Sequence, residues 1–129
     1  ERVQLLHEAQ DMILNLSYSS DATLIVFEVY GDETVVIQNE KFIKTDIRNG
    51  NAPMVSPDGK KIVFMIIEDD GYQIQSGSIS YWDSKTGKIY PIIEDPKIIA
   101  MNPAWANNNL IYYINFLDGS IHSAGLGNQ

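Results

Sequence analysis

Short apolar runs separated by polar turns dominate the hydrophobic pattern of this chain. The best-defined example is the turn Ser56-Pro57-Asp58-Gly59, followed after two lysines by the apolar run Ile62–Ile67. Pro57 fixes φ near the value that a tight turn needs, Asp58 can accept hydrogen bonds from nearby backbone, and Gly59 tolerates a positive φ. The run after the turn is short and rich in β-branched residues, so it favours a strand over a helix. Residues 52–64 therefore predict a strand, a tight turn and a second strand.

The same strand–turn–strand pattern occurs three times. Ser19, Ser56 and Ala106 are equivalent, and the intervals between them are 37 and 50 residues. Repeats of about 40 to 50 residues are typical of four-stranded propeller blades. The second interval is longer because residues 68–77 are expected to form an extended hairpin tip. Only residues 3–14 have roughly helical spacing, and we interpret the start of that segment as a strand because the repeat register requires one there.

Each unit divides into strands joined by turns. We expect strands at residues 13–18, 24–30, 34–38 and 41–46 in the first unit, at 54–55, 62–67, 77–82 and 89–93 in the second, and at 110–116 and 120–123 in the third. The chain then opens with an outer strand at residues 1–8 and stops after a third strand. Because outer and inner strands of one blade commonly come from opposite ends of a propeller, these ends are complementary.

This pattern predicts an all-β fold of about three four-stranded β-propeller blades, at approximately residues 12–46, 52–95 and 99–129, with 1–8 as a closing outer strand. Three blades are too few for a closed ring, since propellers typically have four to eight. We therefore expect the chain to be part of a larger ring, or to be completed by a second copy in a homodimer with six blades.

The segment Val55–Phe64, with its Ser-Pro-Asp-Gly-Lys core, resembles the TolB-like propeller repeat of the WD-repeat superfamily. The segment Ile79–Lys88, with an aromatic residue, Asp83 and a Thr-Gly turn, resembles the third strand and following turn of that repeat. The first unit keeps Asp21 but lacks the proline and glycine, and the third keeps only turn-forming asparagines. The resemblance covers residues 12 to 126.

The resemblance implies a scaffold rather than an enzyme. It implies protein or peptide binding of the kind found in TolB-like envelope proteins, with a periplasmic or extracellular location, although the sequence itself leaves the compartment unknown. It carries over no catalytic residue, because Ser56, Pro57, Asp58 and Gly59 are turn formers. The alternative that it leaves open is a propeller domain of a prolyl oligopeptidase-type peptidase or hydrolase, which would gate access of substrate.

Charge and composition limit the classes of molecule that this chain is expected to bind. The chain has 129 residues, is 44% hydrophobic and carries a formal net charge of −8. A surplus of carboxylates argues against nucleic acid and against an anionic membrane surface, both of which attract Lys and Arg clusters. No apolar run approaches the roughly 20 residues of a membrane span. Without cysteine there is neither a disulfide nor a thiolate metal site.

The sequence offers little catalytic chemistry. The two histidines, His7 and His122, fall on strands at opposite ends of the chain, and would approach each other if those ends paired. Glu68-Asp69-Asp70 and Glu94-Asp95 are rich in oxygen, but neither has the spacing of an EF-hand calcium loop. We therefore expect no catalytic residue, no metal ligand and no cofactor, while a propeller that binds calcium or a small ligand remains a third hypothesis.

The most promising binding feature is the tip Glu68, Asp69, Asp70, Tyr72 and Gln73. Aromatic residues are enriched at binding hot spots, and Tyr72 is the aromatic residue in the most polar surroundings. Trp82 and Trp105 are expected to pack between blades instead. We therefore expect any protein or peptide partner to contact the tip.

Overall fold

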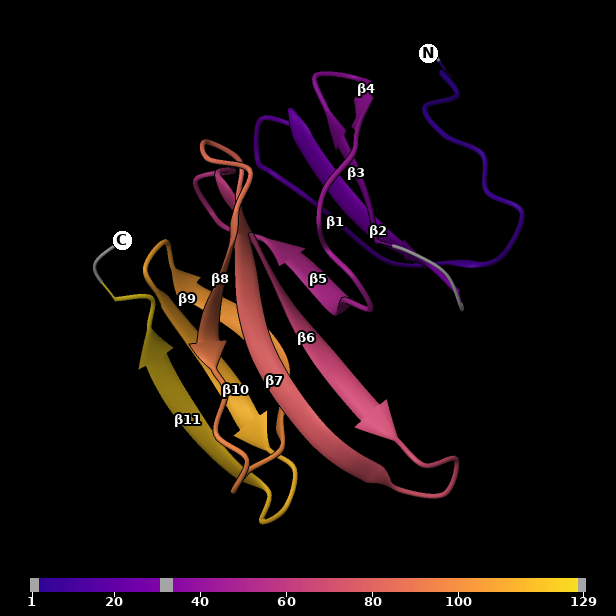
Figure 1. The fold of residues 1–129 in the computed structure, drawn as a ribbon. Helices are drawn as coiled ribbons and strands as arrows, with labels where there is room; N and C mark the ends of the chain where they lie inside the picture. Colours follow the sequence, from indigo (N-terminus) through magenta and orange to yellow (C-terminus); the bar gives the residue numbers. More distant parts are fainter. Residues whose placement is uncertain (1–2, 31–33, 128–129) are drawn as a thin grey trace.

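The computed structural model describes residues 3–30 and 34–127, which form three antiparallel sheets. The sheets are numbered blades 1 to 3 in chain order (Figure 1). No helix occurs among these residues, and hence none that is long and apolar enough to cross a membrane. Blade 1 contains β1 (Ile13–Tyr18), β2 (Leu24–Val29), β3 (Thr34–Gln38) and β4 (Lys41–Ile43); blade 2 contains β5 (Asn51–Val55), β6 (Lys61–Asp69), β7 (Ile74–Asp83) and β8 (Ile89–Ile93); blade 3 contains β9 (Ala100–Asn107), β10 (Leu110–Asn115) and β11 (Ser120–Gly125).

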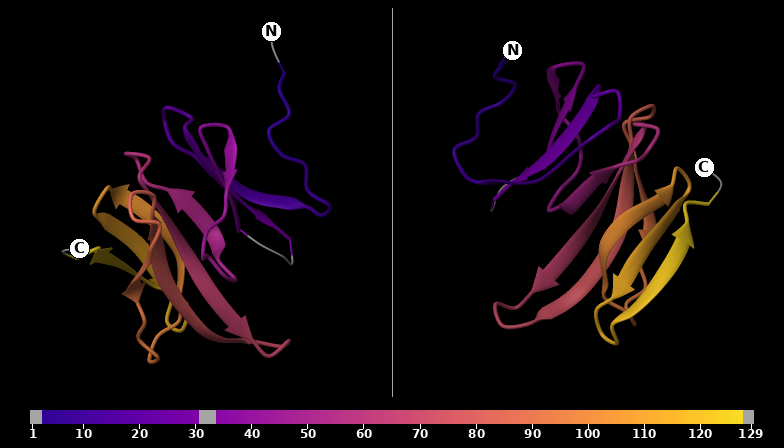
Figure 2. Two further views of the ribbon diagram at one scale, coloured as in Figure 1. Left: turned by 45° about the horizontal axis from the view of Figure 1, so that its top comes forward. Right: turned by 180° about the vertical axis from the view of Figure 1, so that it is seen from behind.

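Within each blade the strands follow one another in chain order, each hydrogen-bonded to the next. Among the first strands of the blades, β5 contacts both β1 and β9, and the blades fan out from these strands (Figure 2). The third blade has three strands among the described residues. The predicted all-β fold of about three blades is confirmed.

The central strands of blade 2 are buried on both faces because this blade lies between blades 1 and 3. Along β6, Ile62 and Phe64 pack against Val26 of blade 1, while Val63 between them packs against Ile111 of blade 3. Successive side chains of a strand point to opposite faces, so an uninterrupted apolar run serves both interfaces. Each fully buried side chain of this size contributes about 1.5–3 kcal/mol. The blades therefore stabilise one another.

In blades 1 and 2 the turn after the first strand is held by one serine and one aspartate, whereas in blade 3 Asn107 Oδ1 accepts the Asn109 N–H at 2.8 Å. In blade 2, the buried Ser56 Oγ donates to Asp58 Oδ1 at 2.6 Å and accepts the Lys61 N–H at 3.0 Å. In blade 1, Ser19 and Asp21 make the same contact at 2.7 Å. Ala22 has a φ of 61°, in the left-handed region that favours glycine, and Gly59 at the equivalent position has a φ of 71°. The turn of blade 1 thus keeps its shape without proline or glycine.

The turns of successive blades touch. The Asp58 N–H donates to Asn108 Oδ1 of blade 3 at 2.8 Å, and a Cβ on Gly59 would lie 2.8 Å from Ser19 Cβ of blade 1. Trp105 also joins two blades, because its Nε1 donates to the Met54 carbonyl at 2.8 Å. These contacts fix the spacing between blades at one end of the fan.

The predicted outer strand at residues 1–8 is wrong for the part that is described, because residues 3–8 form no strand. Residues 1 and 2 lie outside the described residues. A closing strand would have to pair with β11, but the segment lies against blade 1 instead, where the His7 and Phe27 rings are 5.2 Å apart and Ala9 joins the same apolar cluster. His122 stacks on Tyr113 of blade 3, so the two histidines do not meet.

Two smaller differences concern strand ends. The fourth strand of blade 1 stops at Ile43 rather than at residue 46, where Thr45 Oγ1 instead accepts the Ile47 N–H in a local turn. The β6–β7 hairpin is longer than expected, because pairing continues to Asp69 and Ile74. The tip of this hairpin is therefore only a few residues long and rests on a paired ladder.

Replacing Gly59 by alanine tests the contact between turns. Gly59 and Gly87 share a φ of 71°, but only Gly59 has a neighbouring blade within 4 Å. We expect Gly87→Ala to cost about 1 kcal/mol for the left-handed backbone alone. Gly59→Ala should cost at least about 2 kcal/mol, because the new methyl group must displace Ser19. Denaturant unfolding of both variants measures the difference, and equal losses would show that the turns do not hold the blades.

Candidate functional site

A left-handed bulge recurs at one position of every first strand. Asn15, Ala52 and Asn102 have φ values of 54°, 50° and 54°, and each lies four residues before the equivalent residues Ser19, Ser56 and Ala106. The pairing register shifts beside each of them. A bulge bends its strand and frees a backbone N–H from the ladder. The repeat therefore presents the same backbone group at three points around the centre of the fan.

In blades 2 and 3, the freed N–H of the bulge donates a hydrogen bond to a side chain of the preceding blade. The Ala52 N–H donates to Glu28 Oε2 at 3.0 Å, and the Asn102 N–H donates to Met65 Sδ at 3.3 Å. Glu28 and Met65 occupy equivalent positions, since Glu28 is opposite Leu14 in its blade and Met65 is opposite Asn51. Asn15 Nδ2 also donates to Glu28 Oε2. Glu28 therefore links the bulges of blades 1 and 2.

A cavity of about 620 Å³ opens beside Glu28. Its polar wall includes Glu28, Asn15, Asn49, Asn51 and Asp69, and its lining among the described residues contains no lysine, arginine or histidine. Glu28 is only 8% exposed. Cavities of this size hold ligands of several residues or a small molecule. The lining gives the cavity an anionic character.

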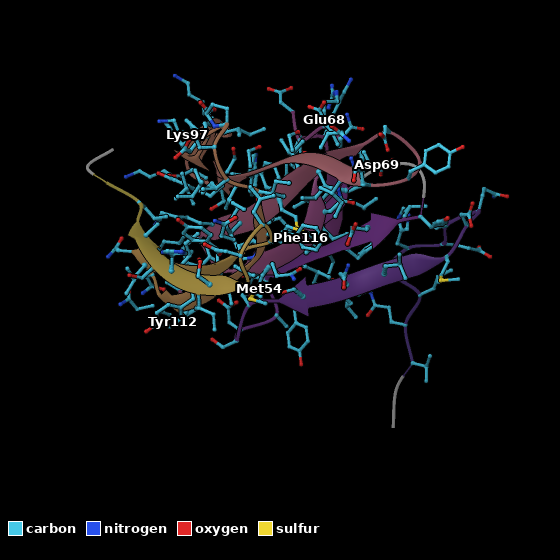
Figure 3. All side chains as sticks on the ribbon, turned by 90° about the horizontal axis from the view of Figure 1, so that it is seen from below. Met54, Glu68, Asp69, Lys97, Tyr112 and Phe116 are labelled. Carbon is cyan, nitrogen blue, oxygen red and sulfur yellow. The ribbon has the colours of Figure 1, made fainter. Side chains whose placement is uncertain are left out.

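The predicted binding tip lies at the edge of this cavity, because Asp69 lines both the cavity and a smaller hollow formed with Gly71, Tyr72, Gln73 and Ile74. Figure 3 shows Glu68 and Asp69 side by side, far from Tyr112 on the opposite side of the molecule. Glu68 is exposed, and Tyr72 is 96% exposed. The predicted tip residues are thus brought together on the surface.

Asp70 organises the tip. Its Oδ1 accepts the N–H groups of Gln73 and Tyr72, each at 2.9 Å, and its Oδ2 accepts Gln75 Nε2 at 3.1 Å. The two backbone hydrogen bonds, that of Gln73 first, lower the pKa of Asp70. Asp69 Oδ1 accepts the Gly71 N–H at 3.0 Å. The carboxylate of Asp70 is therefore engaged in holding the loop, while the Tyr72 ring projects from it.

The turn motif of blade 2 is structural. Ser56 is buried, and Asp58 Oδ1 receives Ser56 Oγ and the Lys60 N–H at 3.1 Å. Burial by itself would raise the pKa of Asp58, but these hydrogen bonds and the two neighbouring lysines lower it overall. Pro57 and Gly59 shape the backbone. All four residues therefore serve to form the turn.

One group in blade 3 superficially resembles a hydrolytic triad. Ser120 Oγ lies 2.5 Å from Asp118 Oδ1 and 2.7 Å from His122 Nε2. In a catalytic triad the acid orients the histidine, whereas here Asp118 contacts the serine. The hydrogen bonds from the Ser120 side chain and N–H lower the pKa of Asp118, as in the other turns. This group is therefore a turn cap at an exposed strand end.

Among the described residues, no three or more His, Asp or Glu side chains are grouped so as to hold a metal ion. Glu94 and Asp95 are exposed, and the Asp95 carboxylate accepts the Lys97 N–H at 2.9 Å. The aspartates of the acidic clusters seen in the sequence, Asp69, Asp70 and Asp95, thus accept hydrogen bonds in local turns.

Sequence reasoning missed Glu28 and the cavity. The available signal was the run Leu24–Val29, in which Glu28 is the one charged residue. Aligning the repeats places it where the other units have Met65 and Ile114, which are both apolar. A carboxylate at a position that is otherwise apolar is a sign of a site.

The titration of Asp70 tests the geometry of the tip. Its lowered pKa means that the folded tip favours the carboxylate, so the hydrogen bonds are complete above the unfolded pKa of about 3.9 and are lost as the pH falls through the lower folded pKa. The Tyr72 and Gln73 amide resonances should therefore move together with a midpoint below 3.9, and Asp70→Asn should abolish the movement. The Val63 amide, in the buried middle of β6, serves as the control for general unfolding.

No family model matches the sequence, and no curated protein matches it. Several solved structures, by contrast, are similar to this chain. The β-propeller domain of the Trilobed protease from Pyrococcus furiosus, described as having an open velcro topology, aligns with a TM-score of 0.63 and 20% identity over 84% of this chain and 36% of that one. The tricorn protease aligns with a TM-score of 0.62 and 14% identity over 84% of this chain and 11% of that one.

TolB from Acinetobacter baumannii aligns with a TM-score of 0.54 and 19% identity over 90% of this chain and 33% of that one. The chain thus spans little more than a third, or less, of the proteins that it resembles. At these identities the likeness concerns the fold. Together with the fan of sheets and the repeated bulges, it shows that the chain has the fold of consecutive β-propeller blades.

Proposed function

We propose that this chain is a non-catalytic propeller scaffold that binds a protein or peptide through the β6–β7 tip and the adjoining cavity. The exposure of Tyr72 on an ordered loop carries the proposal. A tyrosine ring offers a large contact area and loses little conformational entropy on binding. Because nearly the whole ring is exposed to water, its burial contributes nothing to the stability of the fold.

The setting of the tip supports this function. The tip extends from a long paired hairpin, and binding residues are commonly held on loops above a rigid scaffold. Asp70 fixes the backbone on either side of Tyr72, which reduces the entropy that a partner must remove. The cavity beside it provides the concave surface that a peptide needs.

A second candidate function is that of a propeller domain that gates access to a peptidase. The observation in its favour is that two of the similar structures are proteases. A parent polypeptide that continues into a hydrolase domain would favour this function, and one composed only of propeller blades would favour the scaffold.

Selection of peptides from a random phage library on the purified chain tests the scaffold function. We expect peptides that bind saturably to the wild-type chain and at least tenfold more weakly to Tyr72→Ala. Tyr112→Ala is the matched control, since Tyr112 is an exposed tyrosine on the opposite side of the molecule. Equal losses in both variants, or no saturable peptide at all, would contradict binding at the tip.

We also propose that two copies complete a six-bladed ring. Blades 1 and 3 each leave an apolar face without a neighbouring blade in the described part of the chain: Tyr18 is 64% and Ile121 is 74% exposed. The corresponding faces are buried where blade 2 packs against blades 1 and 3. Closing the ring would require the segment around His7 to leave Phe27, since it lies over the open face of blade 1.

The mass of the chain in solution tests ring closure. Analytical ultracentrifugation should give about 29 kDa, twice the 14.5 kDa of one chain, because a ring of two chains has six blades. Removing residues 1–9 should strengthen the dimer by clearing the open face of blade 1. A stable monomer in both forms would overturn the proposal.

A further inference from the structure

Glu28 is a departure from the repeat that the fold does not require. Met65 and Ile114 fill the equivalent positions of blades 2 and 3. Met65 receives the bulge N–H of the next blade through its sulfur, so a thioether suffices for that contact. The carboxylate of Glu28 therefore needs a reason other than blade packing.

Burial makes this carboxylate costly. Glu28 is 8% exposed, and no lysine, arginine or histidine among the described residues forms an ion pair with it. An unpaired buried charge costs several kcal/mol unless hydrogen bonds compensate for it. Here both donors, Asn15 Nδ2 and the Ala52 N–H, are directed at the same oxygen, Oε2. Both donors are neutral groups, so the carboxylate has no cationic partner among the described residues.

The second oxygen is available to the cavity. Oε1 of Glu28 has no hydrogen-bond partner in the described part of the chain, and it is not among the polar atoms that are sealed from solvent there. Glu28 lines the 620 Å³ cavity, and Asp69 adds a second carboxylate at its edge. The position suits a cation that enters from the cavity and completes the hydrogen bonding of the carboxylate.

The rest of the lining indicates an organic cation. Leu14, Ile67 and Met101 form apolar walls, and Asn49 and Asn51 add neutral polar groups. A lysine or arginine side chain combines a charged end with an apolar stem, and so matches walls of both kinds. Resting on the function proposed above, we propose that Glu28 and this cavity bind a lysine or arginine side chain of the peptide partner.

The test uses blocked pentapeptides that carry lysine, arginine, norleucine or citrulline at the centre of an alanine–leucine sequence. We expect the lysine and arginine peptides to shift the Ala52 amide resonance saturably, because its N–H donates to the same carboxylate. The norleucine and citrulline peptides should bind at least tenfold more weakly. Spermidine and calcium chloride, tested alone, should leave the resonance unchanged at the concentrations that saturate with peptide.

Three variants complete the test. Glu28→Gln keeps an acceptor for Ala52 but loses the charge, and should weaken the cationic peptides at least tenfold while leaving the melting temperature equal or higher. Glu28→Met, which copies Met65, should do the same. Glu94→Gln removes an equal charge from an exposed position outside the cavity, and should change binding less than twofold.

The outcomes distinguish a failure of the cation site from a failure of the scaffold function. If peptides bind with equal strength whatever their charge, or if Glu28→Gln binds them as well as the wild type does, the cation site is wrong while the scaffold stands. If calcium or spermidine alone saturates the Ala52 shift, the site takes a different ligand. If neither cationic nor neutral peptides bind, the scaffold function fails as well.

Discussion

Everything in this molecule depends on the contact of one blade face with the next. A single blade is a small twisted sheet whose middle strand carries apolar side chains on both faces, so it cannot bury them alone. β6 shows the consequence, with Phe64 packed towards blade 1 and Val63 towards blade 3. Burial on both faces also explains why two polar atoms of blade 2, Tyr81 Oη and Trp82 Nε1, lie sealed without a partner in the described part of the chain. The cost of about 1–3 kcal/mol for each is offset by the large apolar rings that they belong to.

Two sets of polar contacts convert this stacking into a defined geometry. At one end, the serine–aspartate turns touch from blade to blade through Gly59, Asp58 and Asn108. Towards the centre, the bulge N–H groups reach back to Glu28 and Met65 of the preceding blade. Apolar faces alone would allow blades to slide, since hydrophobic contact has no direction. Hydrogen bonds at both places set the register of one sheet against another.

The sequence predicted those features that recur and are local. The turn of blade 2 could be read from Ser56 to Gly59, and the weaker turn of blade 1 from Asp21, because a carboxylate cap acts within a few residues. The exposure of Tyr72 followed from its polar neighbours. The segment at residues 3–8 was misjudged because repeat register indicates that a strand is due but not which sheet edge lies within reach. Glu28 was missed because its partner Ala52 lies in another blade, 24 residues away, and only a bulge brings the N–H to it.

The three blades also act as internal controls for one another. What all three share, namely the bulge and a tight turn after the first strand, is what the propeller requires. What one blade has and the others lack is free to serve another purpose. Blade 2 alone has the long β6–β7 hairpin that ends in Tyr72, and blade 1 alone places a carboxylate behind the bulge. These two departures meet at one cavity, which Asp69 and Glu28 both line. Independent drift from a repeat would scatter such changes over the surface, whereas a shared ligand brings them to the same place.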